Sequence, residues 1–156
     1  MDSVYIETTI ISYLAARFSR DLLVAAHQQA THDWWRARRP LFECYVSQVV
    51  IDEARAGDAE ASGLRMRFMD ELLFLEVTEQ AESLTEAILA AGAMPVQAVR
   101  DAAHVAVAAV NGIDYLLTWN CRHLANAQIM RKMAKVCNSE GFAMPLICTP
   151  EELMGA

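Results

Sequence analysis

Short β-prone segments alternate with helical segments along the whole chain, and no other feature of the sequence restricts the fold as strongly. The β-prone segments are residues 4–6, 43–46, 73–77, 115–118 and 145–148. Such alternation is typical of a mostly parallel sheet, because right-handed crossovers bring each strand back to the same sheet through a helix. The sequence therefore predicts an α/β fold of about five strands with helices on both faces.

The segments between these strands carry helical periodicity and helix end signals. A Thr that follows Glu7 is a suitable N-cap for a helix at 10–16, and Ser47 is one for a helix that reaches Ala56. Further helices are expected at 59–72, 84–91, 97–111 and 126–136. Residues at spacings of three and four also predict a helix over 23–39 whose core-facing stripe is Leu23, Ala26, Ala30, Trp34 and Ala37.

Length and composition favour a single domain over residues 1–156. The chain has 156 residues, 54% of them apolar, which suits one core and excludes a disordered chain. The longest apolar run, Val105–Val110, is far shorter than the roughly 20 residues that cross a bilayer, so no membrane partner is expected. The N-terminus lacks a basic start followed by an apolar stretch, and we therefore expect a cytoplasmic protein.

Charge and cysteine content narrow the functional classes less sharply. The net charge of −7 argues weakly against nucleic acid as a partner, although the basic residues form small Arg-rich clusters such as Arg36, Arg38 and Arg39. The four cysteines include no C-x-x-C pair, so zinc binding and redox cycling are not indicated. We expect reduced thiols in or near the core.

Polar residues at the ends of the expected strands indicate where the chemistry lies. Glu7 directly follows the first strand, and Asn120 follows the strand at 115–118. Ligands of open parallel sheets bind beyond the carboxyl ends of the strands, so both residues are expected on one rim. Asp101 lies in the first turn of an otherwise apolar helix and shares a face with His104. A buried charge in such surroundings needs a partner or a metal ion.

Glu53 is the third candidate carboxylate. In the helix that starts at Ser47 it aligns with Val49 and Val50, the side expected to face the sheet, whereas Asp52 points outward. Glu7, Glu53 and Asp101 would then converge without an assigned Lys or Arg. Oxygen ligands of this kind suit Mg²⁺ or Mn²⁺, which also bind substrate phosphates.

The sequence resembles the PIN domain in four motifs that occur in the family's order. The strings are Tyr5-Ile6-Glu7-Thr8-Thr9, 47–54 with Glu53, 101–106 with Asp101 and His104, and Leu117-Thr118-Trp119-Asn120. The whole chain is similar to VapC-like PIN proteins of prokaryotes, many of which are the toxin ribonucleases of toxin–antitoxin pairs. The resemblance implies a Rossmann-like three-layer sandwich with strand order 3-2-1-4-5, a carboxylate site for Mg²⁺ or Mn²⁺, and cleavage of RNA. It also implies a small antitoxin partner and a homodimer.

Two positions depart from the PIN pattern. Glu7 replaces the usual Asp and is one methylene longer, which would move the metal by about the length of a C–C bond. Asn120 replaces a common Asp and brings no charge. One unit charge at about 4 Å from a divalent ion is worth several kcal/mol at an effective dielectric constant near 20, so we expect one tightly held ion rather than two.

The main hypothesis is a metal-dependent ribonuclease. Glu7, Glu53 and Asp101 would hold the ion and Asn120 would assist at the same catalytic site, with no protein nucleophile. Supporting roles are expected for Thr8, Thr118 and His104, with three structural alternatives: a helix cap for Thr8, a plain strand position for Thr118 and a satisfied core residue for His104.

Two other functional classes remain open from the sequence. One is a catalytically weak relative that binds RNA or a protein, which Asn120 and the charge of −7 favour. The other is a phosphoacceptor domain of the response-regulator type, which the spacing disfavours because neither Lys132 nor Lys135 follows a strand.

Overall fold

The computed structural model describes residues 1–156 and contains one five-stranded sheet. Its strands are β1 (Ser3–Ile6), β2 (Glu43–Ser47), β3 (Leu73–Leu75), β4 (Tyr115–Leu117) and β5 (Leu146–Cys148). All neighbours pair in parallel, in the order β3-β2-β1-β4-β5, which confirms the expected topology. The first strand of the chain is therefore the central strand of the sheet.

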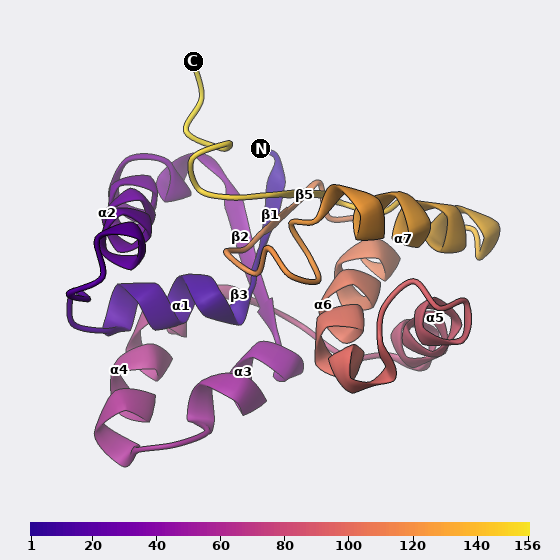
Figure 1. Cartoon of the computed structure of the whole chain (residues 1–156), viewed down its shortest axis with the longest axis horizontal. Coiled ribbons are helices and arrows are strands. Elements are labelled where there is room, and N and C mark those ends of the chain that lie inside the picture. Colours follow the sequence, from indigo (N-terminus) through magenta and orange to yellow (C-terminus); the bar gives the residue numbers. More distant parts are fainter.

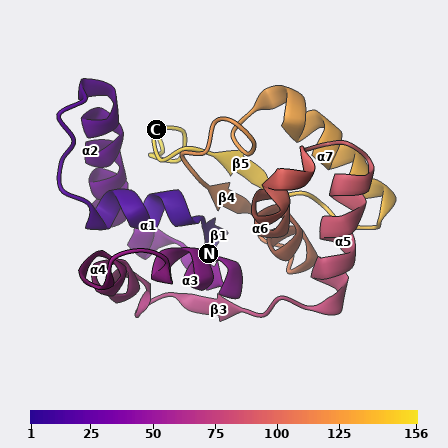
Figure 2. The same cartoon turned by 60° about the horizontal axis from the view of Figure 1, so that its bottom comes forward.

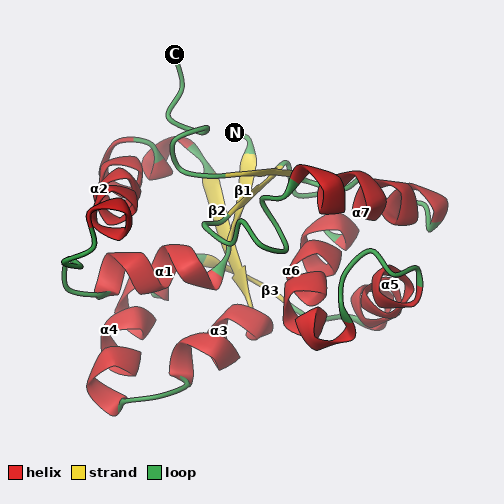
Figure 3. Cartoon of the chain, in the orientation of Figure 1, coloured by secondary structure: helices red, strands yellow, loops and turns green.

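Helices cover both faces of this sheet and make three layers (Figures 1 and 3). On one side lie α1 (Thr8–Ala15), α2 (Leu22–Ala37), α3 (Gln48–Arg55) and α4 (Ala59–Met69). On the other side lie α5 (Glu79–Ala90), α6 (Val99–Val110) and α7 (Ala127–Ser139), a division that the turned view repeats (Figure 2). Short 3-10 helices at Arg39–Leu41 and Val96–Ala98 precede β2 and α6.

The core follows from this layering. Val4, Tyr5 and Ile6 on β1 are all fully buried, because a central parallel strand has helices on both faces. The apolar helix α6 is buried at nearly every position after its first turn, as its composition predicts. No helix is long and apolar enough to cross a membrane.

The starts of three helices meet at one edge of the sheet. α3 follows β2 directly, α1 follows β1 after the single residue Glu7, and α6 begins at the same end of the molecule (Figure 1). β1 and β4 are neighbours although β2 and β3 come between them in the sequence. The strand order reverses here, which is where open α/β sheets bind ligands.

Helix boundaries agree with the sequence signals at several ends and differ at others. Ser47 is the N-cap of α3, as predicted, and Asn111 ends α6 before Gly112, which has a φ of 65°. The first helix begins earlier than expected, because the carboxylate of Glu7 caps it and Thr8 is already helical. The four cysteines are free; Cys121 is exposed and the other three are buried.

The predicted core stripe of α2 is confirmed at Trp34, which is fully buried, and at Ala30, which packs against the core, but it is wrong at its other three positions. Leu23, Ala26 and Ala37 are exposed, and the buried residues of α2 are Gln28, Thr31 and Trp34. The polar pair is buried because each side chain is hydrogen-bonded by distant groups. The Gln28 amide donates to the carbonyl of Arg17 and accepts from the amide of Ser19. Likewise, the indole of Trp119 donates to the Thr31 hydroxyl at 2.7 Å.

We expect the Thr31→Val substitution to lower the free energy of unfolding by about 1–3 kcal/mol, because it leaves the buried indole N–H of Trp119 without an acceptor. Thr31→Ser is the matched control, since it keeps the hydroxyl and removes a methyl group. Urea unfolding measures both variants. A Val variant as stable as the Ser variant would contradict this account of α2.

Candidate metal centre

Glu7 lies where β1 ends and α1 begins, and it is 3% exposed. The backbone N–H of Thr9 donates to its Oε2 at 3.1 Å. The hydroxyls of Thr9 and Thr118 both donate to its Oε1, at 2.5 Å each. Thr118 follows β4, so this contact joins the ends of two adjacent strands. No Lys or Arg forms an ion pair with Glu7. The buried charge is therefore stabilised by these three hydrogen-bond donors.

Glu53 reaches the same region from α3, and its side chain is 22% exposed. Its Oε1 accepts hydrogen bonds from the Thr8 hydroxyl at 2.8 Å and from Nε2 of His104 at 2.6 Å. Burial acts to raise the pKa of Glu53, but the hydrogen bonds and the nearby charges of His104 and Arg100 hold that pKa below its ordinary value. Its second oxygen, Oε2, makes no hydrogen bond.

His104 is fully buried one turn into α6 and contacts two polar groups. Its Nε2 faces Glu53, and its Nδ1 lies 2.7 Å from the hydroxyl of Tyr5. That hydroxyl lies 2.7 Å from Oγ of Ser47. Burial acts to lower the pKa of His104, but the carboxylates of Glu53 and Glu7 raise it above 6.5 overall. Burial also raises the pKa of Tyr5.

Asp101 is placed at the rim but turned toward a different partner. Its Oδ2 lies 2.8 Å from Nδ1 of His123, and the two side chains are 19% and 20% exposed. Asp101 is close enough to raise the pKa of His104 through its charge. The tightest cluster of possible metal ligands, however, is Glu7, Glu53 and His104, whose ligand atoms lie within 4.8 Å of one another.

Asn120 makes its hydrogen bonds within the loop that follows β4. Its Oδ1 accepts the backbone N–H of His123 at 3.0 Å, and its own backbone N–H donates to the hydroxyl of Thr118. The neighbouring Trp119 is 8% exposed and stacks on His27 with ring centroids 4.0 Å apart. Asn120 thus shapes this loop, and Trp119 fixes the loop against α2.

The donor set fits a divalent cation that prefers oxygen. Glu53 has one carboxylate oxygen without a hydrogen bond, and so has Asp101, while Oε2 of Glu7 accepts only one. Glu7 is also a buried charge with no cationic side chain paired to it. An Mg²⁺ or Mn²⁺ ion would balance these charges and leave positions for water and phosphate oxygens.

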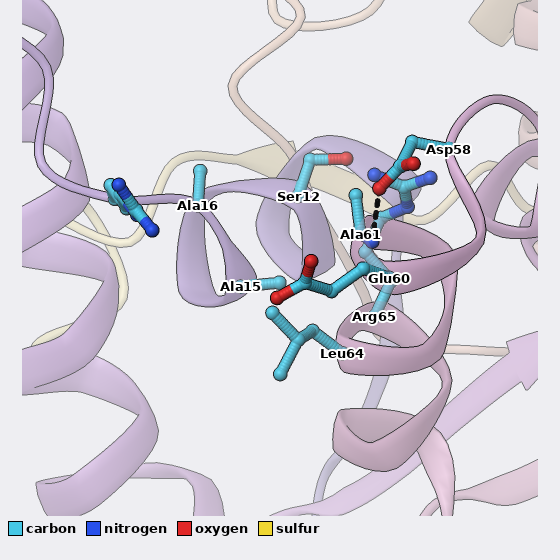
Figure 4. A pocket seen from close by; sticks show the side chains of 9 residues that line it. Ser12, Ala15, Ala16, Asp58, Glu60, Ala61, Leu64 and Arg65 are labelled. Carbon is cyan, nitrogen blue, oxygen red and sulfur yellow. Dashed lines mark hydrogen bonds between the residues drawn. The ribbon is translucent and has the colours of Figure 1, made fainter.

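One hollow in the surface lies away from the candidate carboxylates. It measures about 270 Å³ and is formed where the end of α1 meets the start of α4 (Figure 4). Its lining includes Ser12, Asp58, Leu64 and Arg65, and none of the candidate carboxylates. The guanidinium of Arg65 is engaged there by the carbonyls of Ala54 and Ala56, which end α3.

Several residues of the site were missed in the sequence. Thr9 orients Glu7, His123 pairs with Asp101, and Tyr5 and Ser47 continue the contacts of His104. Tyr5 was hidden because a tyrosine in a buried strand looks like a core residue. The role of His123 could not be predicted because its partner Asp101 is 22 positions away, and no local sequence spacing indicates such a contact.

The ion pair between Glu53 and His104 predicts a pH dependence of stability. His104 has a raised pKa in the folded state, so its contribution is complete below pH 6.5 and is lost as the pH rises through the folded-state pKa. The depressed pKa of Glu53 keeps its contribution above pH 4.5 and loses it as the pH falls further. We expect the pair to stabilise most between these limits.

This dependence is measured as the difference in unfolding free energy between wild type and His104→Gln, in chelator and across pH 5 to 9. The difference should shrink above pH 6.5. A difference that is constant over the whole range would show that the pair carries no net charge interaction.

Comparisons with known proteins identify the fold. The sequence matches no family model and no curated protein. Among solved structures, the VapBC2 complex of Rickettsia felis, bound to a DNA fragment from its promoter, gives a TM-score of 0.62 at 11% identity and covers 94% of this chain and 98% of that one. VapC20 of Mycobacterium tuberculosis, a toxin that cleaves the sarcin–ricin loop, gives a TM-score of 0.51 at 18% identity and covers 72% of this chain and 86% of that one. The protein therefore has the same three-layer α/β fold as these VapC structures.

Proposed function

We propose that this protein is a metal-dependent ribonuclease of the toxin type. The observation that carries the proposal is the meeting of two carboxylates, Glu7 and Glu53, with His104 within 4.8 Å at the carboxyl edge of the sheet. Asp101 lies beside them at the start of α6. The similarity in fold to a VapC protein that cleaves RNA supports the same chemistry here.

Glu7, Glu53 and Asp101 would hold Mg²⁺ or Mn²⁺. Such an ion supplies an activated water and neutralises the charge that develops on a scissile phosphate. The chain's own part is to fix the carboxylates: Thr9 and Thr118 orient Glu7, while Thr8 and His104 orient Glu53. Preorganised donors of this kind need no rearrangement when the reaction occurs.

The role of Asn120 is less direct than those of the three carboxylates. Asp101 accepts one hydrogen bond from His123 and keeps Oδ1 for the ion. Asn120 uses its side-chain oxygen to hold the backbone of His123, and in this way it supports the pair between Asp101 and His123. We propose that Asn120 contributes to catalysis by keeping this loop in place, with one ion bound.

Metal binding and cleavage are tested on the same samples. We expect Glu53→Gln and Asp101→Asn each to weaken Mn²⁺ binding on the order of 100-fold, because each removes a unit charge close to the ion. The variants should also lose cleavage of a structured RNA. Titration calorimetry gives the affinity, and gel electrophoresis of labelled RNA gives the activity.

The matched control is Asp52→Asn, a neighbour on α3 that is exposed and hydrogen-bonded to Gln48. It should bind Mn²⁺ and cleave RNA as wild type does. Folded wild-type protein that neither binds Mn²⁺ nor cuts RNA would refute the proposal. It would then favour the second candidate, a module that binds RNA or a protein.

That second candidate has one specific observation in its favour. The side-chain oxygen of Asn120 and one oxygen of Asp101 are already engaged by His123, as in a purely structural network. It predicts that Glu7→Gln keeps or improves RNA binding, because the substitution removes repulsion of phosphate. Filter binding with Mn²⁺ present distinguishes the two candidates, because the variant of a metal centre that Glu7 helps to form would bind RNA more weakly.

The toxin role implies partners as well as a substrate. The solved VapBC2 complex supports the proposal of a small antitoxin that covers the rim, and we further propose a homodimer in the cytoplasm. Induced expression of the wild-type chain alone in bacteria should arrest growth, whereas Glu53→Gln should not. Growth curves with matched protein levels test this, and equal growth of the two strains would exclude toxicity.

A further inference from the structure

A buried line of hydrogen bonds leads from β2 to the candidate metal centre. It connects Oγ of Ser47 to the Tyr5 hydroxyl at 2.7 Å, that hydroxyl to Nδ1 of His104 at 2.7 Å, and Nε2 of His104 to Glu53 at 2.6 Å. Ser47, Tyr5 and His104 are all fully buried. The line joins β1, β2, α3 and α6, the elements that meet at the rim.

The carboxylate fixes the direction of one hydrogen bond in this line. A carboxylate only accepts, so Nε2 of His104 carries a proton and donates it to Glu53. The Tyr5 hydroxyl then either donates to Nδ1 and accepts from Ser47, or accepts from Nδ1–H and donates to Ser47. A hydroxyl serves both cases, so Nε2 of His104 keeps its hydrogen bond to Glu53 whether the ring carries one proton or two, and only the charge interaction is lost with the second proton.

Packing alone does not account for the hydroxyl of Tyr5. The ring of Tyr5 meets the His104 ring edge to face, with centroids 5.6 Å apart, and a phenylalanine ring would make the same contact. A buried hydroxyl is costly unless it is hydrogen-bonded, and this one has a partner on each side. The two partners are a helix cap and the histidine that holds Glu53.

We infer that Tyr5 is a positioning residue for the metal centre: through His104 it fixes the carboxylate of Glu53 so that Oε2 is presented to the ion. The inference rests on the proposed function, because it assigns Tyr5 a part in that same site. Removing the hydroxyl leaves Nδ1 of His104 without a partner, and the ring then gains freedom to turn away from Glu53.

The direct test is Tyr5→Phe, with Mn²⁺ as the probe. Losing an outer hydrogen bond to a ligand typically costs about 10–100-fold in metal affinity, and we expect a loss in this range by calorimetry. The half-saturating Mn²⁺ concentration for RNA cleavage should rise by the same factor, with KM for RNA unchanged. Excess Mn²⁺ should restore the rate.

The matched control is Tyr45→Phe. Tyr45 lies opposite Tyr5 on the neighbouring strand, and its hydroxyl contacts only Glu43 at 3.3 Å near the surface. It should bind Mn²⁺ and cleave RNA as wild type does. Near-ultraviolet circular dichroism confirms that both variants are folded.

A second pair of variants tests His104 as the link. His104→Ala should lose Mn²⁺ affinity, and His104→Gln should recover part of it, because the Gln amide places an N–H donor near the position of Nε2. In metal-free wild type, the ¹⁵N spectrum of the imidazole should show a proton on Nε2. Tyr5→Phe should broaden that signal or change its tautomer.

The outcomes separate this inference from the proposed function. If wild type binds Mn²⁺ and cuts RNA while folded Tyr5→Phe binds the ion equally well, the role of Tyr5 is refuted and the nuclease stands. Equal losses in Tyr5→Phe and Tyr45→Phe would refute it too. If wild type binds no Mn²⁺, the proposed function fails, and the positioning role fails with it.

Discussion

The buried carboxylate of Glu7 is the constraint on which the surrounding structure depends. A charge that is 3% exposed needs compensation, and here hydroxyl and amide donors supply it in place of an ion pair. Two of those donors come from Thr9 in the first turn of α1, and one comes from Thr118 after β4. The central strand, its following helix and its neighbouring strand must therefore stay in register for the charge to be tolerated.

The same use of hydroxyl groups extends across the rim. Thr8 holds Glu53, and Tyr5 and Ser47 support His104. Hydroxyl groups orient a carboxylate without neutralising it, whereas an arginine or lysine would cancel the charge. Glu7 therefore keeps its negative charge while it is held in place, and a histidine is the only side chain that pairs with Glu53 or Asp101 as a cation. That combination suits a cation that arrives from solution and is exchanged there.

The fold could be predicted from the sequence because its signals are local. Strand and helix periodicity, together with the caps Ser47 and Asn111, depend on neighbours within a few positions. Glu7 and Glu53 could be found for the same reason, since each follows from its place after a strand or on a helix face. The polar positions of α2 were not predicted to be buried, because Gln28 bonds to the loop before the helix and Thr31 bonds to Trp119, which lies 88 positions away. The pair of Asp101 with His123 was hidden for that reason too, and so was the hydroxyl of Tyr5.

The contact between Thr118 and Glu7 joins residues 111 positions apart. Translation proceeds from the N-terminus, so Glu7 leaves the ribosome long before the residue that completes its surroundings. Until β4 emerges, the central strand lacks one neighbour, and the carboxylate at its end lacks one of its donors. The site is therefore assembled only when most of the chain has been made. A product that terminates early would keep Glu7 and Glu53 in its sequence and yet lack the chemistry that depends on their placement.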